Sequence, residues 1–344
     1  MTRPRLRAAL IGLGRMGRHH ARVLRHLDGV DLIAAADPHG DPYHAVDGLP
    51  VAHDIDQLLC HRPDYAVLAC PTLLHEALGL QLAHAGIPTL IEKPLATTPG
   101  AARRLRDAFH TADIPAAVGY IERFNPALIA LRARLENGDL GDVFEIGTRR
   151  TGPYPDRITD VGVIHDLATH DLDLTTWITH HAYTSIAART AHRTGRPHED
   201  LLAALGQLDD GTITHHQVNW VTPRKARTTT VTGEHGCLVA DTLTADLTHW
   251  ANGHTPHHWD ALTTFRGVTE GDVTRYALDK KEPLHAEHEA FRNLVRGTGP
   301  GPADLSEGVR TVMVTHITSR AAHTGETEPV PHQARGTEHR FRDH

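Results

Sequence analysis

The chain has 344 residues, enough for two domains with substantial apolar cores. Its formal net charge of −7 argues against nucleic acid as the main partner, because phosphate binding needs a concentrated basic surface. Three cysteines without paired spacing indicate a reducing compartment, and the N-terminus lacks the long apolar region of a signal peptide. No apolar run is long enough to span a bilayer, so we expect a cytoplasmic protein without a membrane partner.

Apolar strands alternate with helices over residues 1–120. The strands predicted there are 6–11, 31–36, 51–52, 65–70, 88–91 and 116–119. The helices between them include 55–59, 73–85 and 99–111. This alternation is typical of βαβ units, so we predict an N-terminal Rossmann domain with a parallel sheet.

The pattern changes near residue 121. The helices predicted from here on are 126–136, 164–179, 284–295 and 306–322. A strand over 143–149 and several alternating segments within 185–243 separate the first helices from the last ones. We therefore predict an α/β protein overall, whose second domain, 121–330, is α+β with an open, largely antiparallel sheet. Asp304 and Glu307 form a capping pair for the last helix, and 331–344 is a polar tail.

A glycine loop, Gly12-x-Gly14-x-x-Gly17, lies between the first strand and the first helix. The first glycine permits a tight turn, the second lets a pyrophosphate approach the backbone, and the third allows close helix–strand packing. Arg15 and Met16 complete the loop, and we expect both to contact the cofactor. Asp37 ends the second strand, where a carboxylate accepts hydrogen bonds from ribose hydroxyls and repels a 2′-phosphate. The sequence thus predicts NAD rather than NADP.

Lys93 follows an apolar strand and precedes Pro94, which biases it towards an extended conformation. Its ammonium is expected at the carboxyl end of the sheet, where open α/β folds bind ligands, although a surface lysine capping the strand is an alternative. Pro71, Thr72 and His75 follow another strand and are expected to line the nicotinamide end of the same edge. A surface role for His75, at a helix N-terminus, is an equal alternative.

Asp166 and His170 are four positions apart on the helix predicted over 164–179, and therefore share a face. A carboxylate beside an imidazole fixes its orientation and raises its basicity, as a general base requires. Taken alone, an exposed helical ion pair is an alternative. Thirty histidines are scattered along the chain without a common ligand spacing, and we expect no metal.

Taken together, these motifs resemble the Gfo/Idh/MocA oxidoreductase family. The matching elements are Gly12-Leu-Gly-Arg-Met-Gly17, Pro71-Thr72-x-x-His75, Glu92-Lys93-Pro94 and Asp166-x-x-x-His170. The resemblance implies an NAD(P)-dependent oxidoreductase acting on CH–OH groups of a sugar, cyclitol or related polyol. It implies Lys93 and His170 as acid/base residues, Asp166 as a substrate or histidine-orienting group, and Glu92 among the cofactor residues. It also implies a homodimer or homotetramer formed through the C-terminal sheet.

A narrower resemblance, to the nucleotide-sugar branch with its UDP-N-acetylglucosamine 3-dehydrogenases, rests on 119–126, 160–173 and 219–236. It implies oxidation of a UDP-N-acetylhexosamine at C3 to a 3-keto sugar. Tyr120 replaces the histidine common in the branch. The expected substrate residues are Tyr120, Arg123, Asn125, Arg149, Arg157 and Lys225, with basic side chains for the diphosphate.

Two other functions remain open from the sequence. An inositol or free-sugar dehydrogenase would use the same residues with a smaller pocket. A non-catalytic, cofactor-sensing regulator would keep the fold, but it would not need Lys93, Asp166 and His170 together.

Overall fold

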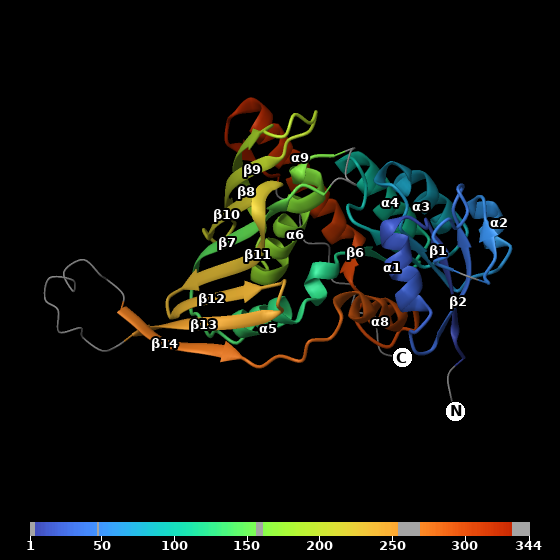
Figure 1. Cartoon of the computed structure of the whole chain (residues 1–344), viewed down its shortest axis with the longest axis horizontal. Helices are drawn as coiled ribbons and strands as arrows, with labels where there is room; N and C mark the ends of the chain where they lie inside the picture. The colour runs from blue at the N-terminus through green and yellow to red at the C-terminus, as the bar shows by residue number, and fades with distance from the viewer. Residues whose placement is uncertain (1–3, 47, 156–160, 254–268, 332–344) are drawn as a thin grey trace, which may run out of the picture. The chain divides into compact units, whose positions relative to one another are not determined.

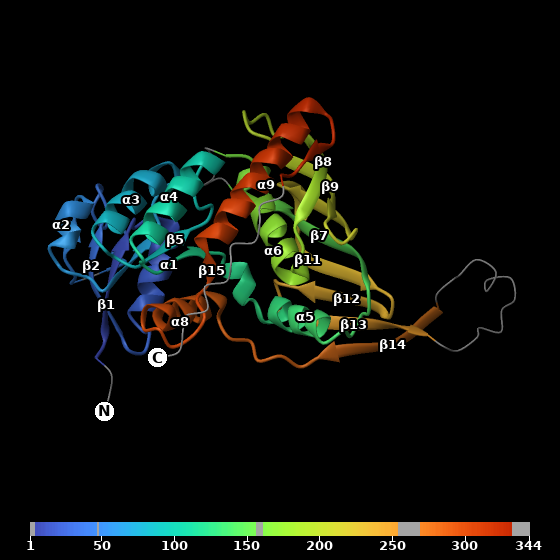
Figure 2. The same cartoon turned by 180° about the vertical axis from the view of Figure 1, so that it is seen from behind.

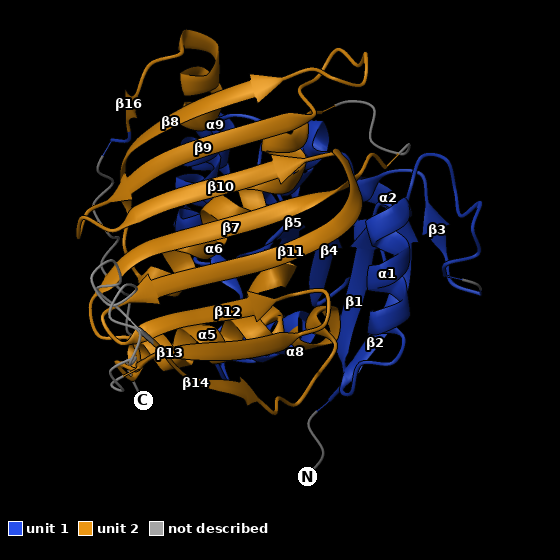
Figure 3. Cartoon of the chain, turned by 60° about the vertical axis from the view of Figure 1, so that its left-hand side comes forward, with its two compact units in different colours: residues 1–120, 287–316, 330–344 blue, residues 121–286, 317–329 orange. Residues whose placement is uncertain are grey.

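The computed structural model describes residues 4–46, 48–155, 161–253 and 269–331 (Figure 1). The chain divides into two compact units (Figure 3). Unit 1 comprises Met1–Tyr120, Glu287–His316 and Val330–His344, and unit 2 comprises Ile121–Ala286 and Ile317–Pro329. The sequence prediction kept 121–330 in one domain, whereas the chain returns to unit 1 at Glu287.

The sheet of unit 1 has seven strands in the order β15-β6-β5-β4-β1-β2-β3. They are β1 (Leu6–Ile11), β2 (Val30–Ala36), β3 (Val51–Ala52), β4 (Tyr65–Leu68), β5 (Thr89–Glu92), β6 (Ala116–Gly119) and β15 (Ala303–Asp304). All neighbours are parallel except β15, which is antiparallel to β6. The first six strands have the doubly wound order of a Rossmann fold, which changes direction between β1 and β4. The predicted Rossmann domain is confirmed.

Helices cover both faces of this sheet (Figure 2). They are α1 (Arg15–Leu24), α2 (Ile55–Leu59), α3 (His75–His84), α4 (Pro99–Thr111) and α8 (Pro283–Val295), with a short 3₁₀ turn, η1 (Thr72–Leu74), before α3. Successive strand residues enter opposite apolar clusters: Leu90 packs with Leu24 of α1 and Phe291 of α8, whereas Ile91 packs with Leu105 of α4. Burial on both faces explains why these strands read as continuous apolar runs.

The sheet of unit 2 has nine strands in the order β14-β13-β12-β11-β7-β10-β9-β8-β16. Its strands are β7 (Val143–Pro153), β8 (Tyr183–Ala191), β9 (Leu201–Leu208), β10 (Ile213–Asn219), β11 (Val221–Gly233), β12 (Gly236–Asp241), β13 (Asp246–Gly253), β14 (Thr269–Tyr276) and β16 (Glu328–Pro329). Among the described strands of this second sheet, only β7 and β10 pair in parallel. The prediction of a largely antiparallel open sheet is therefore confirmed.

Two helices of unit 2, α5 (Pro126–Glu136) and α6 (Thr169–Thr179), pack on one face of this sheet. Leu131 and Leu174 join Ile146 and Val231 of the sheet in one apolar core. The opposite face carries no described helix of unit 2, as Figure 3 shows. Side chains alternate between the two faces, so β9 and β10 present every second residue to the uncovered side.

The last helix, α9 (Leu305–Thr324), begins with a capping box. The Asp304 carboxylate accepts from the Glu307 N–H at 2.7 Å, and the Glu307 carboxylate accepts from the Asp304 N–H at 2.9 Å. This reciprocal pair satisfies two N–H groups at the helix start and confirms the predicted capping pair. Every described helix is too short or too polar to cross a membrane.

Candidate active site

The glycine loop after β1 is shaped by contacts that only glycine allows. Gly12 has φ +93°, and a Cβ there would lie 2.7 Å from the carbonyl oxygen of Ala69. A Cβ on Gly17 would lie 1.9 Å from the carbonyl oxygen of Gly12. In contrast, a Cβ on Gly14 would meet nothing within 4 Å. Two glycines are thus required by the loop itself, and the third leaves an open space beside the backbone.

This space lies at the N-terminus of α1, whose N-cap Gly14 provides no side-chain hydrogen bond. The first N–H groups of a helix lack intrahelical acceptors and carry the positive end of its dipole. An open cradle with uncapped N–H groups fits a pyrophosphate. Arg15 is exposed and Met16 is half-buried in this first turn, so both border the cradle.

Asp37 directly follows β2, and its carboxylate is held against the loop. One oxygen accepts from the Leu13 N–H at 2.8 Å and the other from the His39 N–H at 2.9 Å. A carboxylate has further lone pairs, so it can still accept hydrogen bonds from a ribose. The residues present therefore fit NAD.

His75 joins two turns at the carboxyl ends of β4 and β5. Its Nδ1 lies 3.0 Å from the Pro94 carbonyl oxygen and its Nε2 lies 3.1 Å from that of Cys70. The ring is 1% exposed, and burial lowers the pKa of His75 despite the opposing effect of these carbonyls. Both nitrogens are directed at the backbone, so the structure favours a clamp between the turns over the predicted cofactor contact. Pro71 is exposed and Thr72 half-buried at the start of η1.

Lys93 is half-buried and follows the last residue of β5. The adjacent Glu92 is 6% exposed, and its Oε2 accepts from the Lys93 backbone N–H at 3.1 Å. Its Oε1 lies 2.9 Å from Nε2 of His20. The Glu92 carboxylate is thus bound inside unit 1, which corrects its predicted role as a direct cofactor ligand.

In unit 2, Asp166 lies in a π-helical turn, Ile164–Ala168, that leads directly into α6 with His170. The Thr169 N–H reaches back five residues to the Ile164 carbonyl. The sequence predicted one α-helix over 164–179, and the structure shows a wider first turn. Such turns inside helices occur frequently at functional sites. Asp166 and His170 are both half-buried, as expected for side chains that reach both protein and solvent.

Glu199, in the loop between β8 and β9, holds the start of this segment. Its Oε1 accepts from the Ile164 N–H at 3.0 Å, and its carbonyl oxygen accepts from the Val163 N–H at 3.0 Å. A Cβ on Gly162 would lie 2.1 Å from the Glu199 carboxylate, so this position must be glycine for the cap to form. Glu199 is a functional-site residue that the sequence did not reveal, because its only signal was a glycine shortly before the predicted helix.

Buried ion pairs lie next to His170 in the sequence and within unit 2. Arg123 donates two hydrogen bonds, of 2.8 and 2.7 Å, to the carboxylate of Asp173. Arg150 donates to Asp171 at 2.9 Å and to Glu122 at 2.9 Å. Burial raises the pKa of the Asp171 carboxyl, although the charge of Arg150 acts in the opposite direction. For Arg150, burial lowers the pKa, but the carboxylates of Asp171 and Glu122 outweigh this effect, so the pKa is raised. Arg123, predicted to bind substrate, is a buried partner of α6 instead.

Two further expected substrate residues are interior. Asn125 is 6% exposed; its Oδ1 accepts from the Ala127 N–H and its Nδ2 donates to the Thr242 carbonyl, so it caps α5. Tyr120 is 1% exposed and belongs to an apolar cluster of unit 1. Both side chains are thus largely engaged within the protein, and their predicted substrate roles stay predictions.

The remaining basic candidates are distributed differently. Arg149 is exposed and pairs in register with Gln217 and Thr228, on the face of the sheet opposite to α6. Arg149 and α6 therefore lie on opposite faces of the sheet, and the phosphate contact of Arg149 stays a prediction. Lys225 is exposed on β11 and stays a prediction. Arg157 lies outside the described residues.

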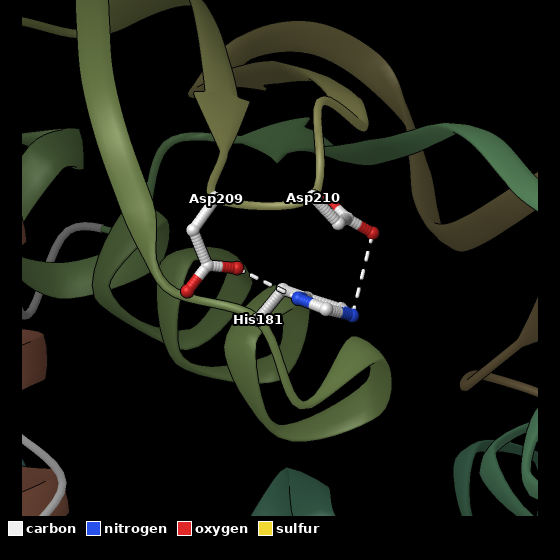
Figure 4. A group of neighbouring side chains, drawn as sticks. All are labelled: His181, Asp209 and Asp210. Carbon is white, nitrogen blue, oxygen red and sulfur yellow. Dashed lines mark hydrogen bonds and ion pairs between the residues drawn. The ribbon is translucent and has the colours of Figure 1, made fainter.

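One histidine–carboxylate group could hold a metal ion by its ligand types: His181, Asp209 and Asp210. Both carboxylates point towards the His181 ring (Figure 4), with 2.7 Å from Nδ1 to Asp209 and 3.4 Å from Nε2 to Asp210. The group joins the segment after α6 to the turn after β9. Ion pairing within the group explains this geometry, so it gives no reason to infer a metal.

Two family models match the chain. The first, "Oxidoreductase family, NAD-binding Rossmann fold", covers residues 6–120, and the second, "GFO/IDH/MocA C-terminal domain", covers 128–239. Together with the cradle, they define the chain as an NAD-binding oxidoreductase, as the sequence predicted. It belongs to the Gfo/Idh/MocA family.

Three similar proteins illustrate the range of relatives. UDP-N-acetylglucosamine 3-dehydrogenase from Acidithiobacillus ferrooxidans is 27% identical over 92% of this chain and 97% of its own length. Inositol 2-dehydrogenase 4 from Saccharopolyspora erythraea is 32% identical over 55% of this chain. The matched region covers 58% of that protein, which is less than two thirds of its length. The WlbA dehydrogenase from Bordetella pertussis, solved with NADH and UDP-GlcNAcA, has a TM-score of 0.82 at 21% identity, covering 97% of this chain and 100% of that one. At this low sequence identity, the structural similarity shows that the two chains share a fold.

A pair of alanine substitutions tests the cradle. Gly17→Ala should destabilise unit 1 by about 1–3 kcal/mol or more, because the clash is with backbone and cannot be relieved by a rotamer. Gly14→Ala should change stability by less than about 1 kcal/mol but weaken NAD binding roughly ten-fold, the equivalent of one charge-assisted hydrogen bond. Thermal unfolding and NAD titration calorimetry measure these effects. Unchanged NAD affinity in the folded Gly14→Ala variant would remove the cradle from the cofactor site.

The cap on the Asp166 segment makes a second prediction. Glu199→Ala should lower the free energy of unfolding by about 1 kcal/mol, whereas Glu199→Gln keeps an acceptor oxygen and should cost less. Gly162→Ala should displace the Glu199 side chain from the same cap. The free energy of unfolding of the Gly162→Ala/Glu199→Ala double variant should therefore be little lower than that of either single variant. Urea unfolding measures all four variants. Fully additive losses would show that Gly162 and Glu199 do not act through a shared contact.

Proposed function

We propose that the protein is an NAD-dependent dehydrogenase that oxidises a sugar hydroxyl, and that its substrate is a UDP-N-acetylhexosamine oxidised at C3 to a 3-keto sugar. The observation that carries the proposal is the position of Lys93, directly after β5 at the carboxyl edge of a sheet with an NAD cradle. The choice of a UDP-sugar is supported by similarity over nearly the whole chain to a UDP-N-acetylglucosamine 3-dehydrogenase.

In this proposal, His170 takes the proton from the hydroxyl that is oxidised. Lys93 holds the same oxygen and stabilises the negative charge that develops on it. Asp166 orients His170 or the sugar, from the π-helical turn that precedes α6. When bound, the nicotinamide would supply the hydride acceptor. Lys225 and Arg157 remain the candidates for the diphosphate, because basic side chains match phosphate oxygens.

A second candidate is an inositol dehydrogenase. Similarity to an inositol 2-dehydrogenase at 32% identity favours it, although that similarity covers only 55% of the chain. The same residues would act on a free cyclitol, and Lys225 would have no phosphate to bind.

The protein is also proposed to be a homodimer or homotetramer formed through the sheet of unit 2. Its uncovered face carries four large apolar side chains: Leu205, Ile213, Trp250 and Val273, which are 42–56% exposed. A face of this kind on a nine-stranded sheet is typical of an interface rather than of a solvated surface.

The substrate assignment predicts NADH formation when the purified protein is mixed with NAD and UDP-N-acetylglucosamine. Lys93→Ala and His170→Ala should each lower turnover by about 10²–10⁴-fold, the usual contribution of a positioned acid or base, while NAD still binds. Absorbance at the NADH band and NAD titration measure the two effects. Turnover of myo-inositol without reaction or inhibition by any UDP-hexosamine would favour the second candidate.

The oligomer proposal makes its own prediction. Leu205→Asp combined with Ile213→Asp should convert the wild-type oligomer to monomers, because two charges would be buried in the interface without partners. Leu73→Asp, which changes an exposed leucine of unit 1, is the matched control and should keep the wild-type mass. Light scattering after gel filtration gives these masses. A monomeric wild-type protein would contradict the proposal.

A further inference from the structure

Four titratable side chains are buried together in unit 1, behind Lys93. They are His20 of α1, Glu92 of β5, and Glu287 and His288 of α8, with exposed fractions of 0%, 6%, 0% and 1%. Charged and imidazole groups are rarely buried this completely unless they pair with one another. No other part of the proposed mechanism uses His20, Glu287 or His288.

Three of these residues form a hydrogen-bonded chain that ends at Lys93. His288 Nε2 lies 2.8 Å from His20 Nδ1, and His20 Nε2 lies 2.9 Å from Glu92 Oε1. The other carboxylate oxygen of Glu92 accepts from the Lys93 backbone N–H. A carboxylate only accepts, so His20 Nε2 carries the hydrogen. When His20 is neutral, its Nδ1 is an acceptor, and His288 Nε2 must be the donor.

Glu287 differs from Glu92 in its surroundings. Both of its carboxyl oxygens are buried without a hydrogen-bond partner in the described structure. Burial, and then the nearby charge of Glu92, raise the pKa of Glu287 well above its ordinary value. Burial also raises the pKa of Glu92. The hydrogen bond from His20 and the charges of His20 and Lys93 outweigh this effect of burial, so the pKa of Glu92 is lowered. Glu92 accepts hydrogen bonds from two N–H groups whereas Glu287 accepts none, so this geometry favours the negative charge on Glu92 and the proton on Glu287.

We propose that His20 and His288 are positioning residues for Lys93: they hold Glu92 as an oriented carboxylate that binds the Lys93 backbone, while Glu287 beside it stays protonated. The proposal rests on the proposed function, in which Lys93 holds the reacting oxygen. Glu92 fixes the main chain at the strand end and places a negative charge beside the Lys93 ammonium. Loss of either effect would misplace Lys93, and small misplacements of reacting groups are costly.

The proposal has a defined pH signature. The titratable groups that face Glu92 are His20, Lys93, His75, Glu287 and His288. Removing His20 takes away the largest effect that lowers the pKa of Glu92, so this pKa rises. Protonation of Glu92 then begins at a higher pH, and the acid side of the pH–kcat profile should move upwards. A residue that merely filled space would lower stability without moving this profile.

Kinetics of three variants test the positioning role. His20→Leu should lower kcat about ten- to hundred-fold and move the acid limb to higher pH, while the Kd for NAD changes less than about two-fold. His20→Gln places an amide N–H towards Glu92 and should recover most of kcat. His19→Leu changes the exposed neighbour on α1 and is the matched control. An unshifted acid limb in folded His20→Leu, or no recovery in His20→Gln, would overturn the positioning role.

A second measurement does not depend on turnover. The infrared spectrum of the NAD-free protein at neutral pH should contain a protonated carboxylic acid band that disappears in Glu287→Gln. Absence of that band from the wild-type spectrum would overturn the assignment of the proton to Glu287, whatever the substrate. If no sugar or polyol is oxidised by the wild-type protein, the proposed function fails, whereas this spectrum still decides the state of the buried group.

Discussion

The buried carboxylate of Glu92 is the charge around which the reactive edge of unit 1 is organised. A carboxylate 6% exposed cannot be left without hydrogen bonds, since burying an unpaired charge costs several kcal/mol. Its partners come from α1 and from the Lys93 backbone, with α8 behind them through His288. The residues of α8 from Glu287 onwards thus belong to unit 1 through a buried polar contact, His288 with His20, and through the apolar packing of Phe291.

Unit 2 likewise contains buried, hydrogen-bonded charged groups next to His170 in the sequence. Asp171 and Asp173 face the interior from α6 and are bound by Arg150 and Arg123, which come from outside that helix. Removing one partner of such a buried pair costs about 3–5 kcal/mol, so the register of α6 is strongly specified. In both units the side chain proposed to act in the reaction, Lys93 or His170, is adjacent in sequence to a buried charged group that fixes the backbone carrying it.

Local patterns were sufficient to predict the fold. The strand–helix alternation, the spacing of the glycines and the Asp304–Glu307 pair each depend on residues within a few positions of one another. Boundaries shifted where local rules competed: the predicted strand over 65–70 ends at Leu68, and the predicted α-helix over 164–179 begins with a π turn. The return of the chain to unit 1 was missed because its apolar contacts are distant in sequence.

The site was predicted less completely, because the type of a residue indicates which interactions it can make but not which partner it has in the folded protein. Arg123 has the side chain of a phosphate ligand, yet its carboxylate partner lies 50 positions away in α6. His20 recurs with Val23 and Leu24 on the apolar face of α1, but nothing in the sequence indicated its partner His288, 268 positions away. Arg149 illustrates another limit of local patterns: its place in the alternation of β7 turns it to the face opposite α6, and that face is known only once the register is known.

The central claim, that the protein removes a hydride from C3 of a UDP-N-acetylhexosamine, is tested most directly by following that hydrogen. The measurement is mass spectrometry of the reduced cofactor formed from UDP-N-acetylglucosamine carrying deuterium at C3. Removal of the C3 hydride should give NADH that contains one deuterium, with a slower turnover than for the unlabelled sugar. Reduced cofactor without deuterium, formed at the same rate from both sugars, would contradict it.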